Sequence, residues 1–142
     1  MKVFIDASVI IAGILSPNGG SAILFQYIKQ DLVVGLTSQT AIDEVLEHTK
    51  KIKKNKEEIG EFIAQSAVIV RKRIEKETIR PYSDLVDKED AYLIAGAILT
   101  KCTHLVTLDK KHLLRPDIKQ RFLPLRIVSP KEILEEIIRN LS

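Results

Sequence analysis

One carboxylate follows a short apolar run at the start of the chain, and its position constrains the fold more than any other feature. Val3, Phe4 and Ile5 are β-branched or aromatic, which is typical of a buried strand, and Asp6 comes directly after them. The chain then stays almost wholly apolar as far as Leu15. A carboxylate in such a segment is costly to bury unless it is hydrogen-bonded, paired or bound to a cation. Asp6 is therefore either a bonded structural residue or part of a functional site.

Short apolar runs alternate along the chain with segments of helical periodicity. The runs predict strands over 3–5, 32–37, 67–70, 105–108 and 127–128. Between them the periodicity predicts a helix over about 21–30 and further helices that begin at residues 38, 55, 87 and 129. The segment 9–15 is either a helix or a loop turn, and 71–86 shows no clear period. This alternation predicts one parallel sheet covered on both faces. We expect 1–142 to form a single domain.

Several of the predicted helices begin at residues that favour helix N-termini. Ser38 is a good N-cap, and Asn55 and Ser129 each stand three residues before a glutamate, as in a capping box. Ser21 and Asp87 are the expected N-caps of the two other helices.

The composition and the histidine spacing exclude several classes of protein. Cys102 is the single cysteine, so no internal disulfide can form, and a lone thiol is typical of a reducing cytoplasm. No run reaches the roughly 20 uncharged apolar residues of a membrane span, and we expect a soluble cytoplasmic protein. His48, His104 and His112 lack zinc-ligand spacing. No glycine-rich phosphate or dinucleotide loop is present.

Four carboxylates from distant parts of the sequence are expected to meet at one edge of the sheet. In a parallel α/β sheet, the carboxyl ends of the strands share an edge with the N-termini of the following helices. Asp6 ends the first strand and Asp109 ends the fourth. Glu44, or its neighbour Asp43, lies early in the helix after the second strand, and Asp90 lies in the first turn of the helix before the fourth. Each also has a simpler interpretation, as a hydrogen-bonded, solvated, helix-start or turn residue.

Such a cluster of carboxylates either raises some of their pKa values or binds hard cations. Mg²⁺ and Mn²⁺ prefer oxygen ligands, and one or two such ions would activate water and neutralise charge developing on a phosphodiester. Ser8 and Thr107 each stand two residues from one of the carboxylates. We expect them to orient these ligands or a water without binding the ion directly.

Basic residues supply candidate contacts to a nucleic-acid backbone. The net charge is only +3, which permits a polyanionic partner without requiring one. Phosphate contacts of this kind give affinity rather than sequence choice, and a solubilising charged surface is the equally simple alternative. The candidate residues are Lys50, Lys51, Lys110, Lys111 and Arg115.

Together these motifs resemble the PIN domain, nearest to the VapC-like toxin components of bacterial and archaeal toxin–antitoxin modules. The resemblance covers nearly the whole chain and rests on the sequences around Asp6, Glu44, Asp90 and Asp109. It implies a three-layer α/β/α fold and an Mg²⁺- or Mn²⁺-dependent ribonuclease in which these four residues form the acidic set. It also implies a homodimer and neutralisation by a small antitoxin protein.

Two further positions are interpreted through the same resemblance. Ser8 stands where the family often has asparagine, and Asp87 matches an extra acidic position of some members. Asp87 is otherwise simply a helix cap.

Three functions are compatible with the sequence. The leading hypothesis is a metal-dependent endoribonuclease acting on RNA. The alternative is a non-catalytic nucleic-acid-binding or protein-interaction module with the same fold. A third is a phosphohydrolase that uses Asp6 as nucleophile, although such enzymes usually carry a second aspartate where Ser8 stands.

Overall fold

The computed structural model describes residues 1–141, and a five-stranded parallel sheet forms its centre. The strands lie in the order β3-β2-β1-β4-β5. Their bounds are Lys2–Ile5 (β1), Val34–Ser38 (β2), Ile69–Arg71 (β3), His104–Val106 (β4) and Arg126–Val128 (β5). Strand β1 is therefore central, and Asp6 lies at the middle of the sheet's carboxyl edge. The final residue of the predicted domain, Ser142, lies outside the described residues.

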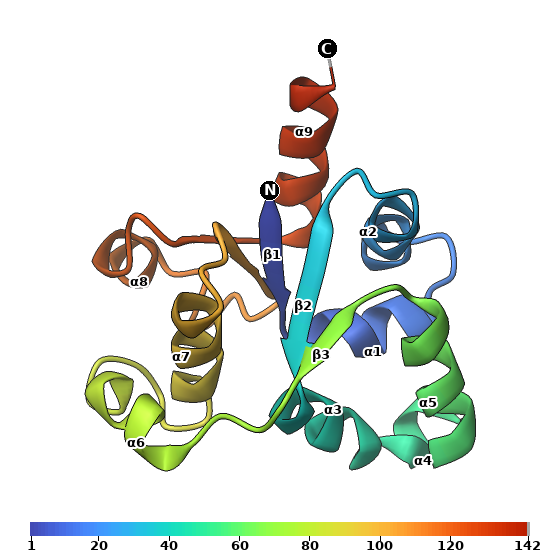
Figure 1. The fold of residues 1–142 in the computed structure, drawn as a ribbon, viewed down its shortest axis with the longest axis horizontal. Coiled ribbons are helices and arrows are strands. Elements are labelled where there is room, and N and C mark those ends of the chain that lie inside the picture. The colour runs from blue at the N-terminus through green and yellow to red at the C-terminus, as the bar shows by residue number, and fades with distance from the viewer. Residues whose placement is uncertain (142) are drawn as a thin grey trace.

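Helices cover both faces of this sheet, so the expected three-layer α/β/α fold is confirmed (Figure 1). In Figure 1, α1, α2 and α5 lie on one side of the strands, α6, α7 and α8 lie on the other, and α3 lies beyond the arrowhead of β2. The helices are Ala7–Leu15 (α1), Gly20–Lys29 (α2), Gln39–Leu46 (α3), Thr49–Ile52 (α4), Lys56–Gln65 (α5), Lys76–Ile79 (α6), Ala91–Leu99 (α7), Pro116–Arg121 (α8) and Pro130–Asn140 (α9), with a 3₁₀ turn, η1, at Arg80–Tyr82.

Within residues 1–141, no single helix has the length and apolar character needed to cross a membrane. Helices α1 and α2 meet that test only when taken as a pair, and they are bent by 100° at the break between them.

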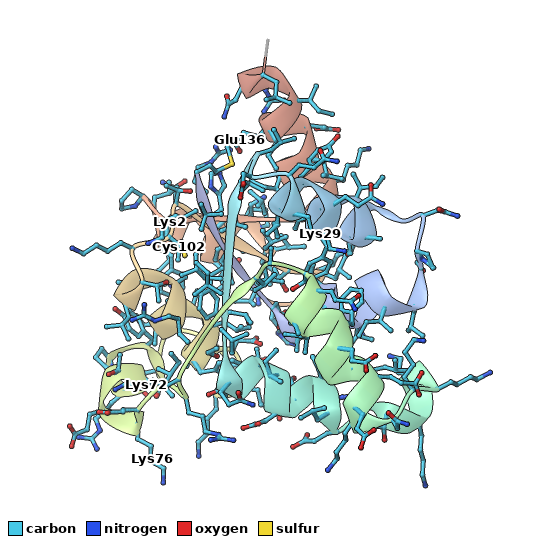
Figure 2. All side chains as sticks on the ribbon, turned by 45° about the vertical axis from the view of Figure 1, so that its right-hand side comes forward. Lys2, Lys29, Lys72, Lys76, Cys102 and Glu136 are labelled. Atoms are coloured by element: carbon cyan, nitrogen blue, oxygen red, sulfur yellow. The ribbon has the colours of Figure 1, made fainter. Side chains whose placement is uncertain are left out.

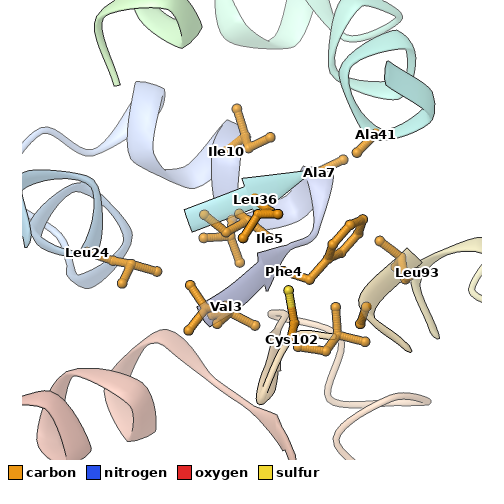
Figure 3. Close-up of a cluster of buried hydrophobic side chains, with 14 of the residues drawn as sticks. Val3, Phe4, Ile5, Ala7, Ile10, Leu24, Leu36, Ala41, Leu93 and Cys102 are labelled. Atoms are coloured by element: carbon orange, nitrogen blue, oxygen red, sulfur yellow. The ribbon is translucent and has the colours of Figure 1, made fainter. Parts of the chain in front are cut away.

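The central strand is buried on both faces, as its continuous apolar sequence predicts. Val3, Phe4 and Ile5 are fully buried. Phe4 points toward Leu93 of α7 (Figure 3), and its ring lies so close to Gly96 that a Cβ added there would come within 2.6 Å of the ring. Gly96 therefore allows α7 to approach the sheet closely, and this approach fixes the N-terminus of α7 over the carboxyl edge.

Three of the five predicted helix caps are confirmed, and those at Ser21 and Asp87 are wrong. The side chains of Ser38, Asn55 and Ser129 each accept a hydrogen bond from a backbone N–H in the first turn, and the last two complete capping boxes. Helix α2 instead begins at Gly20, so Ser21 lies inside the helix and is buried. A hydroxyl next to a glycine pair does not by itself decide at which of the three residues the helix starts.

Two element boundaries at the carboxyl edge also differ from prediction. Helix α7 begins at Ala91 with Asp90 as its N-cap residue, and the backbone N–H groups of Asp90 and Ala91 donate to the Asp87 carbonyl in a preceding turn. Asp87 is therefore not the N-cap of this helix. Strand β4 ends at Val106, which places Asp109 in the following loop rather than at the strand end.

The remaining differences concern short elements at the periphery. The third strand is confirmed as a short edge strand, shifted from 67–70 to 69–71. The unplaced segment 71–86 contains α6 and η1, and the short helix α8 follows the basic turn at 110–115. Helices of four to six residues offer too few turns for a hydrophobic period to show in the sequence.

One histidine that looked isolated in the sequence fastens the last helix to the sheet. His104 Nε2 lies 3.0 Å from the carboxylate of Glu136 on α9, and Arg126 Nη1 donates to the same carboxylate at 2.8 Å. Burial lowers the pKa of His104. Figure 2 shows Glu136 at the end of the molecule opposite Lys76 of α6, so this cluster lies far from the carboxyl edge of the sheet.

Candidate metal centre

Asp6 is a buried carboxylate held by two hydroxyl groups. Its side chain follows β1 directly and is 7 % exposed. Thr107 Oγ1 donates to Asp6 Oδ2 at 2.7 Å, and Ser8 Oγ donates to the same oxygen at 2.9 Å. Burial raises the pKa of Asp6, while these two hydrogen bonds and the backbone amides at the start of α1 oppose the rise. Both hydroxyls share Oδ2, and within residues 1–141 no side chain donates a hydrogen bond to Oδ1.

The same two hydroxyls fix the loop that carries Asp109. The backbone N–H of Leu108 donates to Ser8 Oγ at 3.2 Å, and the N–H of Asp109 donates to Thr107 Oγ1 at 3.1 Å. Each hydroxyl thus accepts from the loop after β4 and donates to Asp6. These hydrogen bonds tie the end of β1 to the loop after β4.

Asp90 is the carboxylate most strongly affected by its neighbours. It is half-buried at the N-terminus of α7. Burial, together with the negative charges of Asp109, Asp6 and Asp87, raises the pKa of Asp90 from its ordinary 3.8 to about 7. A rise of this size arises where carboxylates face one another without a compensating cation, and it marks a candidate functional site.

Glu44, rather than Asp43, is the carboxylate of α3 that faces this edge. Asp43 accepts two hydrogen bonds from Arg73, the shorter of 2.7 Å, and that guanidinium lowers the pKa of Asp43. Glu44 Oε2 instead accepts a 2.5 Å hydrogen bond from the phenol of Tyr92 on α7. Partial burial and the charge of Asp6 raise the pKa of Glu44.

All four predicted carboxylates line one cavity of about 460 Å³ at the carboxyl edge. Glu89 adds a fifth carboxylate to the lining, and Ser8, His48 and Lys51 contribute further polar groups. The apolar lining residues include the exposed side chains of Leu15 and Leu108. The carboxylates that meet there are Asp6, Glu44, Asp90 and Asp109.

The chemistry of this set fits a hard divalent cation. The carboxylate oxygens are the donors that Mg²⁺ and Mn²⁺ prefer, and no ion pair of the described chain neutralises any of the four. Within residues 1–141, no three His, Cys, Asp or Glu side chains are already spaced to hold one ion. A cation here would therefore take part of its ligand set from water, as Mg²⁺ commonly does.

The other predicted site residues lie beside this cavity or away from it. Asp87 pairs with His112 at 3.1 Å, and both line an adjoining cavity of about 330 Å³ that shares Asp90. Arg115 lines the same second cavity and is paired with Asp117. Lys51 lines the carboxylate cavity, whereas the remaining predicted basic residues line neither: Lys50, Lys110 and Lys111.

Sequence reasoning missed two polar partners at this edge. Tyr92 lies in the apolar run of α7, and no role was predicted for it. His48 lies one helical turn after Glu44, and its Nδ1 is 2.8 Å from the Glu44 carbonyl oxygen. One signal could have identified this polar face. Glu44, His48 and Lys51 are spaced four and then three residues apart, which places side chains on one face of a helix.

Comparison with known proteins gives one family match and several structural ones. A family model described as "PIN domain" matches residues 2–111. No curated protein sequence matches the chain. The structure resembles VapBC2 from Rickettsia felis bound to a DNA fragment from their promoter, with a TM-score of 0.63 and 16 % identity, covering 91 % of this chain and 98 % of that one.

Two further solved structures have the same arrangement. VapC20 from Mycobacterium tuberculosis, described as a sarcin-ricin loop cleaving toxin, matches with a TM-score of 0.58 and 13 % identity over 77 % of this chain and 91 % of that one. FitAB bound to an IR36 DNA fragment matches with a TM-score of 0.58 and 14 % identity over 90 % and 94 %. At these identities the likeness establishes the fold.

Proposed function

The chain belongs to the PIN domain family, and on that premise we propose that it is a divalent-metal-dependent endoribonuclease. The observation that carries the proposal is that four carboxylates from four separate segments meet at one cavity. None of these four forms an ion pair with a lysine or arginine of the described residues. Such an arrangement costs free energy in the absence of a cation, as the raised pKa of Asp90 indicates. A cation removes this cost.

The carboxylates differ in how firmly they are held, and their proposed roles follow from this. Asp6 is fixed by two hydroxyls and offers Oδ1 to the ion. Asp90 on α7 and Asp109 in the loop after β4 are proposed to contact the same ion directly or through water, and Glu44 completes the site or positions water. When bound, Mg²⁺ or Mn²⁺ lowers the pKa of water and neutralises charge on a phosphodiester.

Basic residues around the cavity are proposed to hold the RNA backbone. Support is strongest for Lys51, which lines the carboxylate cavity. Arg115 lines the adjoining cavity that shares Asp90. Lys50, Lys110 and Lys111 are exposed and are proposed to act by long-range attraction of phosphate.

We further propose that the chain is the toxin of a toxin–antitoxin pair and acts in the cytoplasm. Support comes from its likeness in fold to VapBC2 bound to a promoter DNA fragment, to VapC20, described as a sarcin-ricin loop cleaving toxin, and to FitAB bound to a DNA fragment. A small antitoxin protein is the proposed partner, and two copies of the chain are proposed to associate. Co-expression with the product of a neighbouring gene tests the first partner, and analytical ultracentrifugation tests the second.

Cleavage of RNA with controlled metal content tests the enzymatic proposal. The protein is expected to cleave RNA with Mg²⁺ or Mn²⁺, and EDTA, Asp6→Asn or Asp90→Asn is expected to abolish cleavage while the far-UV circular dichroism is unchanged. Cleavage that persists in EDTA or in Asp6→Asn contradicts the proposal. RNA binding without cleavage, together with no Mn²⁺ binding at millimolar concentration, favours the non-catalytic module instead.

A further inference from the structure

Glu44 has the longest side chain of the four predicted carboxylates at the cavity. It lies on α3 and carries three rotatable bonds, so an unrestrained Glu44 samples several rotamers. Asp6, by contrast, has a shorter side chain held by Ser8 and Thr107. Something outside α3 must therefore hold the Glu44 carboxylate if it is to act as a ligand.

Tyr92 makes that contact from a rigid position. Its side chain is buried, its phenol donates to Glu44 Oε2 at 2.5 Å, and it stands two residues after Asp90 on α7. Every residue of α7 from Ala91 to Ala97 is buried, which fixes the helix against the sheet. A hydrogen bond to a carboxylate at this distance is of the short, charge-assisted kind.

We propose that Tyr92 is a positioning residue that holds Glu44 at the proposed metal centre, so that α7 supplies Asp90 directly and sets Glu44 through the phenol. The inference rests on the proposed function. The phenol takes Oε2 and leaves Oε1 as the oxygen available to a cation. The backbone contact of His48 to the Glu44 carbonyl does not restrain the carboxylate itself.

This role can be tested by Mn²⁺ binding, without relying on catalysis. Isothermal titration calorimetry and the electron paramagnetic resonance signal of the free ion both measure the Mn²⁺ affinity. Tyr92→Phe removes only the phenolic hydroxyl. We expect Mn²⁺ affinity to fall about 10-fold, the low end of the loss seen when a partner of a metal ligand is removed. Tyr27→Phe is the matched control, because Tyr27 is partly buried against the same core and makes no hydrogen bond at the cavity.

A double-mutant cycle with Glu44→Gln separates positioning from a general effect on the fold. If Tyr92 acts through Glu44, Tyr92→Phe is expected to have no further effect on Mn²⁺ affinity in the Glu44→Gln background. Equal affinity of Tyr92→Phe and the wild type, or an equal loss in both backgrounds, overturns the inference and leaves the proposed function intact. A wild type that binds no Mn²⁺ overturns both.

Discussion

Asp90→Asn is expected to make the metal-free protein more stable while abolishing its proposed activity. The folded protein raises the pKa of Asp90 from 3.8 to about 7 through burial and three negative neighbours. The folded state therefore binds this proton more tightly than the unfolded chain does. Stability consequently decreases as the pH rises from about 4 to about 7, and it stays at the lower level above pH 7. Asparagine carries no charge and escapes this loss.

The size of the effect follows from that pKa. A rise from 3.8 to about 7 corresponds to roughly 4 kcal/mol above pH 7 if the carboxylate is fully shielded from water. Asp90 is only half-buried, and solvent screening reduces this to about 2 kcal/mol. The substitution also removes a negative charge that the N-terminus of α7 stabilises, which lowers the expected gain in stability by about 0.5 kcal/mol. The net gain is about 1.5 kcal/mol, or a rise in Tm of about 5 °C for a chain of this size.

Thermal unfolding in EDTA at a series of pH values measures this difference. Asp90→Asn is expected to melt about 5 °C above the wild type at pH 8, with the difference shrinking below pH 7 and vanishing near pH 4. Asp84→Asn, at an exposed aspartate of the preceding turn, is the matched control and is expected to change Tm little. An Asp90→Asn protein that melts at or below the wild-type temperature at pH 8 refutes the reasoning.

Three other changes test separate parts of the structure. Thr107→Val removes the hydroxyl that donates to buried Asp6, and we expect urea unfolding to show that the free energy of unfolding falls by about 1–3 kcal/mol. Thr107→Ser keeps a hydroxyl and is expected to retain most of this stability. Unchanged stability of the valine variant contradicts the hydrogen-bond assignment. Gly96→Ala places a Cβ 2.6 Å from the Phe4 ring and is expected to cost about 1–3 kcal/mol by the same assay, so a neutral or stabilising result would contradict the close packing of α7 on β1. Lys51→Ala is expected to weaken RNA binding and to reduce the slope of log K against log salt by about 1, and an unchanged slope would remove Lys51 from the RNA contacts.

The fold could be predicted from the sequence because its signals are local and repeated. The continuous apolar run of Val3, Phe4 and Ile5 is typical of a central parallel strand, and β1 occupies that place. The caps at Asn55 and Ser129 were predictable because their partners lie three residues away. The N-cap of α7 was predicted three residues too early, at Asp87, because Asp87 and Asp90 are both acidic residues suited to a helix start and the turn between them is not marked in the sequence.

The candidate site could be predicted in part for a topological reason. Residues that follow parallel strands meet at one edge, so Asp6 and Asp109 come together although 102 residues separate them. Tyr92 could not be identified, because a tyrosine inside an apolar helix has the same pattern whether or not its hydroxyl has a partner. The pairing of Asp87 with His112 depends on how two loops approach each other, and no local pattern encodes that.

The location of Mn²⁺ in a crystal of this protein grown with millimolar Mn²⁺ tests the central claim most directly. Anomalous scattering distinguishes the ion from water. We expect a peak in the carboxylate cavity, about 2.1 Å from Asp6 Oδ1 and within reach of Asp90 and Asp109 directly or through water. A crystal that shows Mn²⁺ only elsewhere, or none while these carboxylates are ordered and open to solvent, would contradict it.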